Sequence, residues 1–235
     1  MPGLARESGR LGRRPSLHSP GPRIAPVQEE RRGVVSPRPV VQAVVIGCSA
    51  GGIAALHHIL PRLPADLPVP VIVVCHTGPS PTDLFSSVLR RDCRLPVMEA
   101  PERGTARPGH IYVAPADYHL LMEEDKTFAL SADPRVNNAR PAIDLLFESA
   151  ANVWGEGLLA VQLTGANDDG AAGMKEVKAA GGLCLVQDPA TATATAMPEA
   201  AIATGAADWV APLDWIAFLI TSLCFSSAPA QDCRP

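Results

Sequence analysis

Residues 44–52, VVIGCSAGG, decide the fold of this 235-residue chain. They overlap a run of mostly apolar residues, 41–47, that has the length of a buried strand, and glycines then surround a cysteine and a serine. The next segment, 53–63, spaces its apolar residues as one face of a helix, with Ile53, Leu56, Ile59, Leu60 and Leu63 on that face. A buried strand that turns through glycines into an amphipathic helix is typical of α/β proteins.

Strand and helix patterns alternate along the rest of the chain. We expect strands over 69–75, 95–100, 109–115, 158–165, 183–188 and 208–213, and helices over 82–92, 141–154, 170–182, 199–205 and 215–224. Segment 119–131 has the pattern of an antiparallel hairpin. Several strands are apolar on both faces, which indicates a sheet covered on both sides. The sequence therefore predicts an α/β fold: a doubly wound, mostly parallel sheet with helices on both faces and an antiparallel hairpin at one edge.

The two ends of the chain differ from its middle. Residues 1–38 are rich in Pro and Arg and carry eight Arg against three Glu, so the net charge of −4 divides into +5 for this segment and −9 for the remainder. We expect a disordered tail over 1–38, a catalytic domain over 39–225 and a second tail over 226–235. An acidic domain is a poor ligand for nucleic acid, so we expect none as a partner.

Composition also bears on the cellular environment. The six cysteines include no C-x-x-C pair, and this usage is typical of free thiols in a reducing compartment. The sequence contains no stretch of about 18 uncharged apolar residues, and its first residues lack the apolar segment of a signal peptide. We therefore expect a cytoplasmic protein that does not insert into a membrane.

Ser49 is the first candidate for chemistry. Segment 47–51, GCSAG, fits the G-x-S-x-G pattern, in which a serine lies on a tight turn between a strand and a helix. The N-terminus of that helix would direct backbone N–H groups toward a developing oxyanion. Two alternatives stay open: the serine caps the helix, or Cys48 is the nucleophile. The glycine spacing differs from that of dinucleotide-binding and P-loop motifs.

A histidine and an aspartate follow other predicted strands. In an open α/β sheet, sites gather at the carboxyl ends of the strands, and His76 is the histidine that directly follows a parallel strand. His110 precedes its strand, so we expect it at the opposite edge. Asp168 and Asp169 follow the strand 158–165, and either could orient the imidazole or cap the next helix. No second His or Cys lies at ligand spacing, so we expect no metal site.

Several separate blocks extend this pattern: IGCSAGG at 46–52, PGHIYVAPADYHL at 108–120, RPAIDLLFESAA at 140–151, LTGANDDGAAGM at 163–174, GGLCLVQDPATA at 181–192 and AMPEAAI at 196–202. In this order they resemble the catalytic domain of the chemotaxis receptor methylesterase, the CheB-type protein-glutamate methylesterase, over residues 41–220. The resemblance places the family's catalytic serine, histidine and aspartate on Ser49, His76 and Asp169.

This resemblance also implies an activity and a partner. It implies a serine hydrolase that removes methyl esters from glutamate side chains of chemotaxis receptors, that also deamidates certain receptor glutamines, and that needs no cofactor. The implied partners are the cytoplasmic helices of those receptors. The sequence does not indicate an oligomeric state.

The chain departs from the family pattern at several positions near these residues. Ala50 stands where the family usually has Thr, Thr77 follows His76 where Met is common, and Ala166-Asn167 replaces Met-Gly. The family's usual receiver domain does not occur in residues 1–38, so we expect no regulation by phosphorylation within the chain. Two other functions stay open: a hydrolase of the same mechanism for a different protein or a small ester, and a catalytically weakened module that binds receptors.

Overall fold

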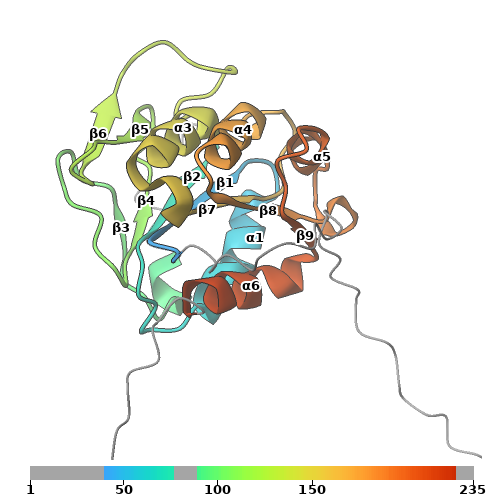
Figure 1. The fold of residues 1–235 in the computed structure, drawn as a ribbon, viewed down its shortest axis with the longest axis horizontal. Helices are drawn as coiled ribbons and strands as arrows, with labels where there is room; N and C mark the ends of the chain where they lie inside the picture. The colour runs from blue at the N-terminus through green and yellow to red at the C-terminus, as the bar shows by residue number, and fades with distance from the viewer. Residues whose placement is uncertain (1–39, 77–88, 226–235) are drawn as a thin grey trace, which may run out of the picture.

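The computed structural model describes residues 40–76 and 89–225. They build a seven-stranded sheet in the order β3-β4-β2-β1-β7-β8-β9, in which every neighbouring pair is parallel (Figure 1). The strands are β1 (Ala43–Cys48), β2 (Val71–Cys75), β3 (Val97–Glu99), β4 (Ile111–Val113), β7 (Leu158–Gln162), β8 (Leu183–Gln187) and β9 (Trp209–Ala211). Strand β1 is flanked by β2 on one side and by β7 on the other, so the strand order reverses beside it, where α/β sheets place their sites.

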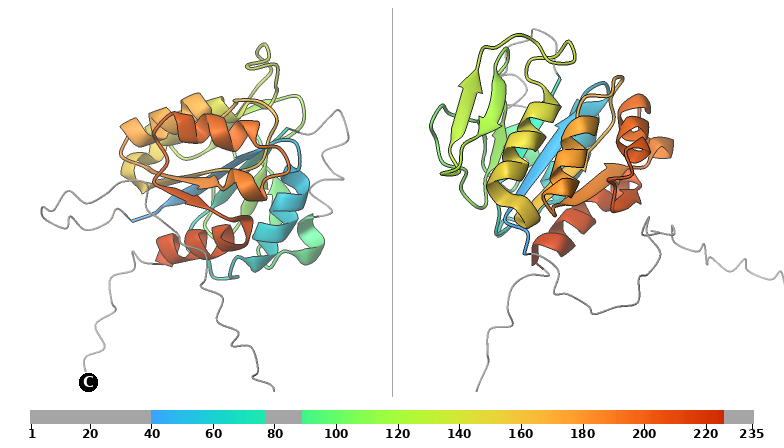
Figure 2. Two further views of the ribbon diagram at one scale, coloured as in Figure 1. Left: turned by 90° about the vertical axis from the view of Figure 1, so that its right-hand side faces the viewer. Right: turned by 45° about the horizontal axis from the view of Figure 1, so that its top comes forward.

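Helices cover both faces of this sheet, which confirms the predicted doubly wound fold (Figure 2). One face carries α1 (Gly52–Ile59), the 3-10 turn η1 (Leu60–Arg62) and α6 (Leu213–Phe225). The other face carries α3 (Ile143–Trp154), α4 (Ala171–Ala179) and α5 (Ala196–Ala203). Short 3-10 turns follow α3 and β8, namely η2 (Gly155–Gly157) and η3 (Pro189–Thr191).

Strand β1 is buried along its whole length because its side chains alternate between two cores. Val44, Ile46 and Cys48 pack toward the α1–α6 face, whereas Ala43 and Val45 pack toward the α3–α5 face. This burial on both faces explains why the strand reads as a continuous apolar run.

The predicted hairpin is confirmed, and it forms a small sheet of its own. Strands β5 (His119–Met122) and β6 (Phe128–Ser131) pair antiparallel with each other and not with the main sheet. The hairpin packs on α3, where the Met122 N–H donates to Ser149 Oγ at 3.1 Å. It therefore stands beside the segment that leads into α3.

Two local predictions need correction. The helix predicted over 53–63 keeps α geometry only to Ile59, because Pro61 cannot donate a backbone hydrogen bond, and the chain continues as η1. Ile53, which we expected on the buried face, is 47% exposed. The helix predicted over 199–205 instead begins at Ala196, with Pro198 tolerated in its first turn.

Some predictions fall outside the described residues. These are both tails, 1–38 and 226–235, and most of the helix over 82–92, of which residues 89–92 are described and helical. Within 40–76 and 89–225, no helix is long and apolar enough to cross a lipid bilayer.

Candidate active site

Ser49 and His76 lie next to each other at the carboxyl edge of the sheet. Their preceding residues, Cys48 and Cys75, are register partners in the parallel pair of β1 and β2. The His76 N–H continues this ladder by donating to the Cys48 carbonyl at 2.9 Å. On the other side, the Ser49 N–H donates to the Thr164 carbonyl, just past β7, at 2.9 Å. The ends of three strands therefore meet at Ser49.

Glycine at position 51 permits the turn that carries Ser49. Gly51 has a φ of +80°, and a Cβ on it would lie 2.4 Å from the Thr193 Cβ. Gly51 is also the N-cap of α1, and no side chain caps that helix. The alternative that Ser49 serves as the helix cap is therefore not supported. The Ser49 side chain remains partly exposed at the start of α1.

A cluster of buried hydrogen bonds around Thr164 and Gln187 fixes the same turn. The Thr164 hydroxyl lies 2.8 Å from the Ala50 carbonyl and accepts the Ala194 N–H at 2.9 Å. The Thr164 N–H in turn donates to Gln187 Oε1 at 2.9 Å. Thr164 and Gln187 are both 1% exposed. Because buried polar groups are costly to leave unpaired, this cluster holds the turn in one geometry.

Cys48 is a core residue. Its side chain is fully buried, and its sulfur and that of Cys75 both lie against Gly52 at the start of α1. The hydrogen bond with Cys75, together with burial, raises the pKa of the Cys48 thiol well above its ordinary value. A buried thiol that resists ionisation is a poor nucleophile, so the alternative with Cys48 as nucleophile is not supported.

His76 is paired with Asp169. Its Nε2 lies 2.8 Å from Asp169 Oδ2, with the imidazole 13% exposed and the carboxylate fully buried. In a neutral imidazole whose Nε2 donates to the carboxylate, Nδ1 carries the free lone pair. Nδ1 is therefore the nitrogen that can accept a proton from outside the pair. Asp168, the other predicted candidate, is exposed and does not contact the ring in the described structure.

Asp169 sits at the N-terminus of α3, where it accepts four hydrogen bonds. Besides His76, the Ile143 N–H donates to Oδ2 at 2.7 Å, and the Asp144 N–H and the Asn137 side-chain amide donate to Oδ1 at 3.1 Å and 3.2 Å. Burial alone would raise the pKa of Asp169, but these hydrogen bonds outweigh it and hold the pKa below its ordinary value. The carboxylate is thus ionised and fixed in direction.

Asp144 is a second carboxylate in the same cluster, which the sequence patterns did not single out. Its Oδ1 accepts the Gly170 and Gly173 N–H groups at 2.8 Å each, at the N-terminus of α4, and its Oδ2 accepts the Asn137 amide at 2.8 Å. Burial and the neighbouring charge of Asp169 raise the pKa of Asp144. The sequence does place Asp144 in the first turn of a predicted helix, where an acidic side chain is favourable. Nothing in the sequence indicates that it accepts hydrogen bonds from the next helix instead.

His119 and His110 have structural positions. His119 is buried, with Nε2 3.1 Å from the Pro134 carbonyl and Nδ1 accepting the Ala142 N–H at 3.2 Å, so it ties the hairpin to the segment before α3. The His110 carbonyl accepts the Val71 N–H at the start of β2, which confirms that His110 lies at the opposite edge.

A small cavity adjoins the His76 ring. Its volume is about 180 Å³. Two arginines and the turn before α3 contribute to its lining, which consists of His76, Arg135, Asn137, Asn138, Ala139, Arg140, Pro141 and Asn167. Arg140 donates to the Ala132 and Asp133 carbonyls at 2.8 Å and 3.0 Å, whereas Arg135 is 59% exposed and reaches Asp117 only at 3.5 Å.

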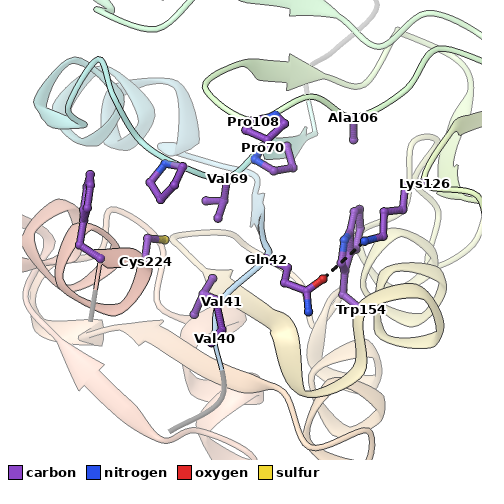
Figure 3. Close-up of a pocket in the computed structure, with 12 residues that line it drawn as sticks. Val40, Val41, Gln42, Val69, Pro70, Ala106, Pro108, Lys126, Trp154 and Cys224 are labelled. Carbon is purple, nitrogen blue, oxygen red and sulfur yellow. Dashed lines mark hydrogen bonds between the residues drawn. The ribbon is translucent and has the colours of Figure 1, made fainter. Parts of the chain in front are cut away.

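A larger cavity of about 530 Å³ lies at the other end of the strands (Figure 3). It is mostly apolar, and its lining includes Val41, Val69, Trp154 and Phe225. Lys126 is its one charged lining residue within the described ranges. The described lining contains no carboxylate and no imidazole. Nor does any group of His, Cys, Asp or Glu side chains in residues 40–76 and 89–225 have the arrangement of a metal site.

A serine on a strand-to-helix turn, beside an imidazole paired with a buried carboxylate, is the arrangement used by serine hydrolases. The family model "CheB methylesterase" matches residues 44–220. The chain belongs to the CheB methylesterase family.

Individual relatives agree with this assignment. A protein from Leptospira interrogans is 46% identical over 182 residues, which cover 77% of this chain and 94% of the relative. The protein-glutamate methylesterase/protein-glutamine glutaminase of Symbiobacterium thermophilum is 43% identical over 178 residues, covering 76% of this chain and 49% of that protein. The crystal structure of the Thermotoga maritima CheB methylesterase catalytic domain superposes with a TM-score of 0.76 at 35% identity, over 78% of this chain and 98% of that one.

Proposed function

We propose that this domain removes methyl esters from glutamate side chains of chemotaxis receptors, with Ser49 as nucleophile, His76 as general base and Asp169 as the residue that orients His76. The hydrogen bond of 2.8 Å between His76 Nε2 and Asp169 Oδ2, next to the Ser49 turn, carries the proposal. The substrate is supported by the relative from Symbiobacterium thermophilum, which is named as a protein-glutamate methylesterase/protein-glutamine glutaminase.

The reaction follows from the proton positions at the site. His76 Nδ1 takes the Ser49 hydroxyl proton while Ser49 Oγ attacks the ester carbonyl carbon. The tetrahedral intermediate expels the methoxy group, which takes that proton and leaves as methanol. Water, deprotonated by His76, then cleaves the acyl-enzyme and releases the glutamate carboxylate. A glutamine side chain would follow the same route and release ammonia.

The carboxylate of Asp169 stabilises the imidazolium that forms during each step. Because it is buried and already bound by four donors, it does not need to reorganise when the charge appears. For the oxyanion, the N–H of Ala50 is our candidate donor. It follows the nucleophile and donates to no acceptor within the described residues. The N-terminus of α1 adds a favourable field at this place.

The partner and the location follow from the substrate. Receptor glutamates lie on helices in the cytoplasm, so we propose a cytoplasmic protein that binds those helices at the carboxyl edge of the sheet. We also propose that residues 39–225 fold and act as one catalytic domain, with the tails at 1–38 and 226–235 unnecessary for hydrolysis.

The test is release of methanol from methyl-esterified receptor fragments by the full chain, Ser49→Ala and His76→Ala. The proposal expects methanol from the wild type and a loss of at least about a thousandfold in either variant. A small aryl ester, cleaved without receptor, reports the chemistry separately. Cleavage of the aryl ester without methanol release would indicate a different substrate. Binding of the receptor without either reaction would indicate a weakened binding module.

A further inference from the structure

Asn137 joins the two carboxylates beside His76. Its side-chain Nδ2 donates to Asp144 Oδ2 at 2.8 Å and to Asp169 Oδ1 at 3.2 Å. One amide nitrogen carries two hydrogens, so each carboxylate can receive one. Among the described side chains, Asn137 is the neutral donor that both carboxylates share.

The backbone holds Asn137 in a tight turn. Asn137 and Asn138 have φ values of +51° and +61°, and the flanking residues Val136 and Ala139 exchange backbone hydrogen bonds of 3.1 Å and 2.8 Å. Two successive residues with positive φ define a type I′ turn, in which asparagine is favoured. The side chain of Asn137 thus reaches the carboxylates from a fixed loop that also borders the cavity at His76.

The charges around Asp169 come from several elements. His76 follows β2, Asp144 belongs to α3, and Asp168 precedes Asp169 in the chain. Arg135 and Arg140 share the cavity with His76. Asp169 Oδ2 bonds to His76 and to the Ile143 N–H, while Oδ1 accepts the Asp144 N–H at 3.1 Å and the Asn137 side-chain amide at 3.2 Å. Among the described residues, Asn137 therefore gives Oδ1 its one hydrogen bond from a side chain.

We propose that Asn137 is a positioning residue for the reaction: by donating to Asp169 Oδ1 beside the Asp144 N–H, it keeps Oδ2 directed at His76 Nε2, and its two N–H groups stabilise the adjoining negative charges of the two aspartates. This inference rests on the proposed function, and it adds a residue outside the serine–histidine–aspartate set. Asn137 acts through Asp169 and does not touch the reacting atoms.

Asn138 provides a matched control. It lies in the same turn with the same sign of φ, and in the described structure its side chain donates to neither carboxylate. Glycine accepts positive φ without strain, so Asn137→Gly and Asn138→Gly disturb the turn equally and differ in the lost donor. Thermal unfolding of both variants checks that they fold alike.

The first readout is the pH profile of kcat/KM for the ester. Loss of the donor makes the Asp169 carboxylate less stabilised, which raises its own pKa and strengthens its pairing with the imidazolium, and both effects move the acid limb to higher pH. We expect a shift of about half to one pH unit and a fall in kcat/KM of roughly three- to tenfold at neutral pH for Asn137→Gly, and an unshifted acid limb for Asn138→Gly. Asn137→Asp, which adds a third negative charge, should shift the limb further than Asn137→Gly.

The second readout does not depend on activity. In a Ser49→Ala background, NMR titration of the His76 ring should give a higher pKa with Asn137→Gly than without it, and no change with Asn138→Gly. If the wild type releases no methanol, the proposed function fails, but this titration still decides the role of Asn137. Equal titration of His76 with and without Asn137→Gly, or equal shifts for the two glycine variants, would overturn the inference.

Discussion

Asp144 and Asp169 exchange helix caps. Asp169, which lies just before α4, accepts the first N–H groups of α3, while Asp144, in the first turn of α3, accepts N–H groups at the start of α4. Asp169 thereby stabilises α3, the helix that contains Asp144, and Asp144 stabilises α4, the helix that follows Asp169. The same hydrogen bonds therefore join α3 to α4 and fix the orientation of the Asp169 carboxylate that pairs with His76.

Removal of the Asp144 side chain should therefore destabilise the domain. Asp144→Ala leaves the Gly170 and Gly173 N–H groups without their acceptor, and we expect a loss of about 1–3 kcal/mol in the free energy of unfolding. Urea unfolding measures the loss. Asp168→Ala, an exposed neighbour in the same loop, should stay within about 0.5 kcal/mol of the wild type. Equal losses in the two variants would contradict the exchanged caps.

Substitution of Asp169 by asparagine should abolish most of the hydrolysis. An amide cannot balance the imidazolium, and its NH₂ group would face N–H donors, so we expect kcat to fall by about a thousandfold or more. Ester hydrolysis by Asp169→Asn and by Asp168→Asn provides the measurement. The second variant should retain activity close to that of the wild type; if instead Asp168→Asn were the inactive one, Asp169 would not be the orienting acid.

The two aspartates should contribute to stability with opposite dependence on pH. The folded pKa of Asp169 is lowered, so its contribution is present above the ordinary aspartate range and is lost as the pH falls through the folded pKa. The folded pKa of Asp144 is raised, so its contribution is greatest at low pH and decreases as the pH rises through the folded pKa. Urea unfolding compares the wild type with Asp169→Asn and Asp144→Asn from roughly pH 3 to 7, a range that includes the ordinary aspartate pKa. The stability difference from the wild type should grow with pH for the first variant and shrink for the second. Parallel curves would contradict the pKa directions.

Gly51 should tolerate no side chain. Gly51→Ala combines a positive φ with a Cβ 2.4 Å from Thr193, whereas Gly205 has a φ of +74° and open space within 4 Å. We expect Gly205→Ala to cost about 1–2 kcal/mol from backbone conformation alone. Gly51→Ala should cost more and also lower ester hydrolysis, because the collision moves the Ser49 turn. Urea unfolding and hydrolysis rates test both variants, and equal costs with full activity would refute this account of the turn.

The Thr164 hydroxyl should matter for rate as well as stability. Thr164→Val keeps the shape of the side chain but removes the partner of the Ala50 carbonyl and the Ala194 N–H, so we expect roughly a tenfold lower kcat and a loss of about 1–2 kcal/mol. Thr164→Ser keeps the hydroxyl and should restore most of both. Failure of serine to restore the rate would indicate that the methyl group, not the hydroxyl, supports the turn.

The sequence predicted the parts of the molecule that follow from local patterns. Strands that are apolar on both faces required helices on both sides, and Ser49 and His76 each directly follow a strand of the parallel sheet, so their meeting at one edge followed from topology. The G-x-S-x-G spacing predicted the glycine turn, which the positive φ of Gly51 explains.

The supporting residues could not be predicted in the same way. Asn137, Asp144 and Thr164 act through contacts between segments distant in the chain, and no spacing rule links a turn asparagine to a carboxylate 32 positions later. The wrong prediction that Ile53 is buried has a related cause. Its helix is short and begins at the edge of the sheet, so the first turn projects past the core that its spacing implied.

The two ends of the described chain lie close together, near the N-terminal ends of the central strands. Val40 and Phe225 both line the cavity at the start of the strands, whereas Ser49 lies where β1 ends. A linker fused before Val40 or after Phe225 would therefore attach the domain at the end opposite Ser49. Domains immobilised on a sensor chip through either terminus should present Ser49 and His76 to the solution, on the side away from the support.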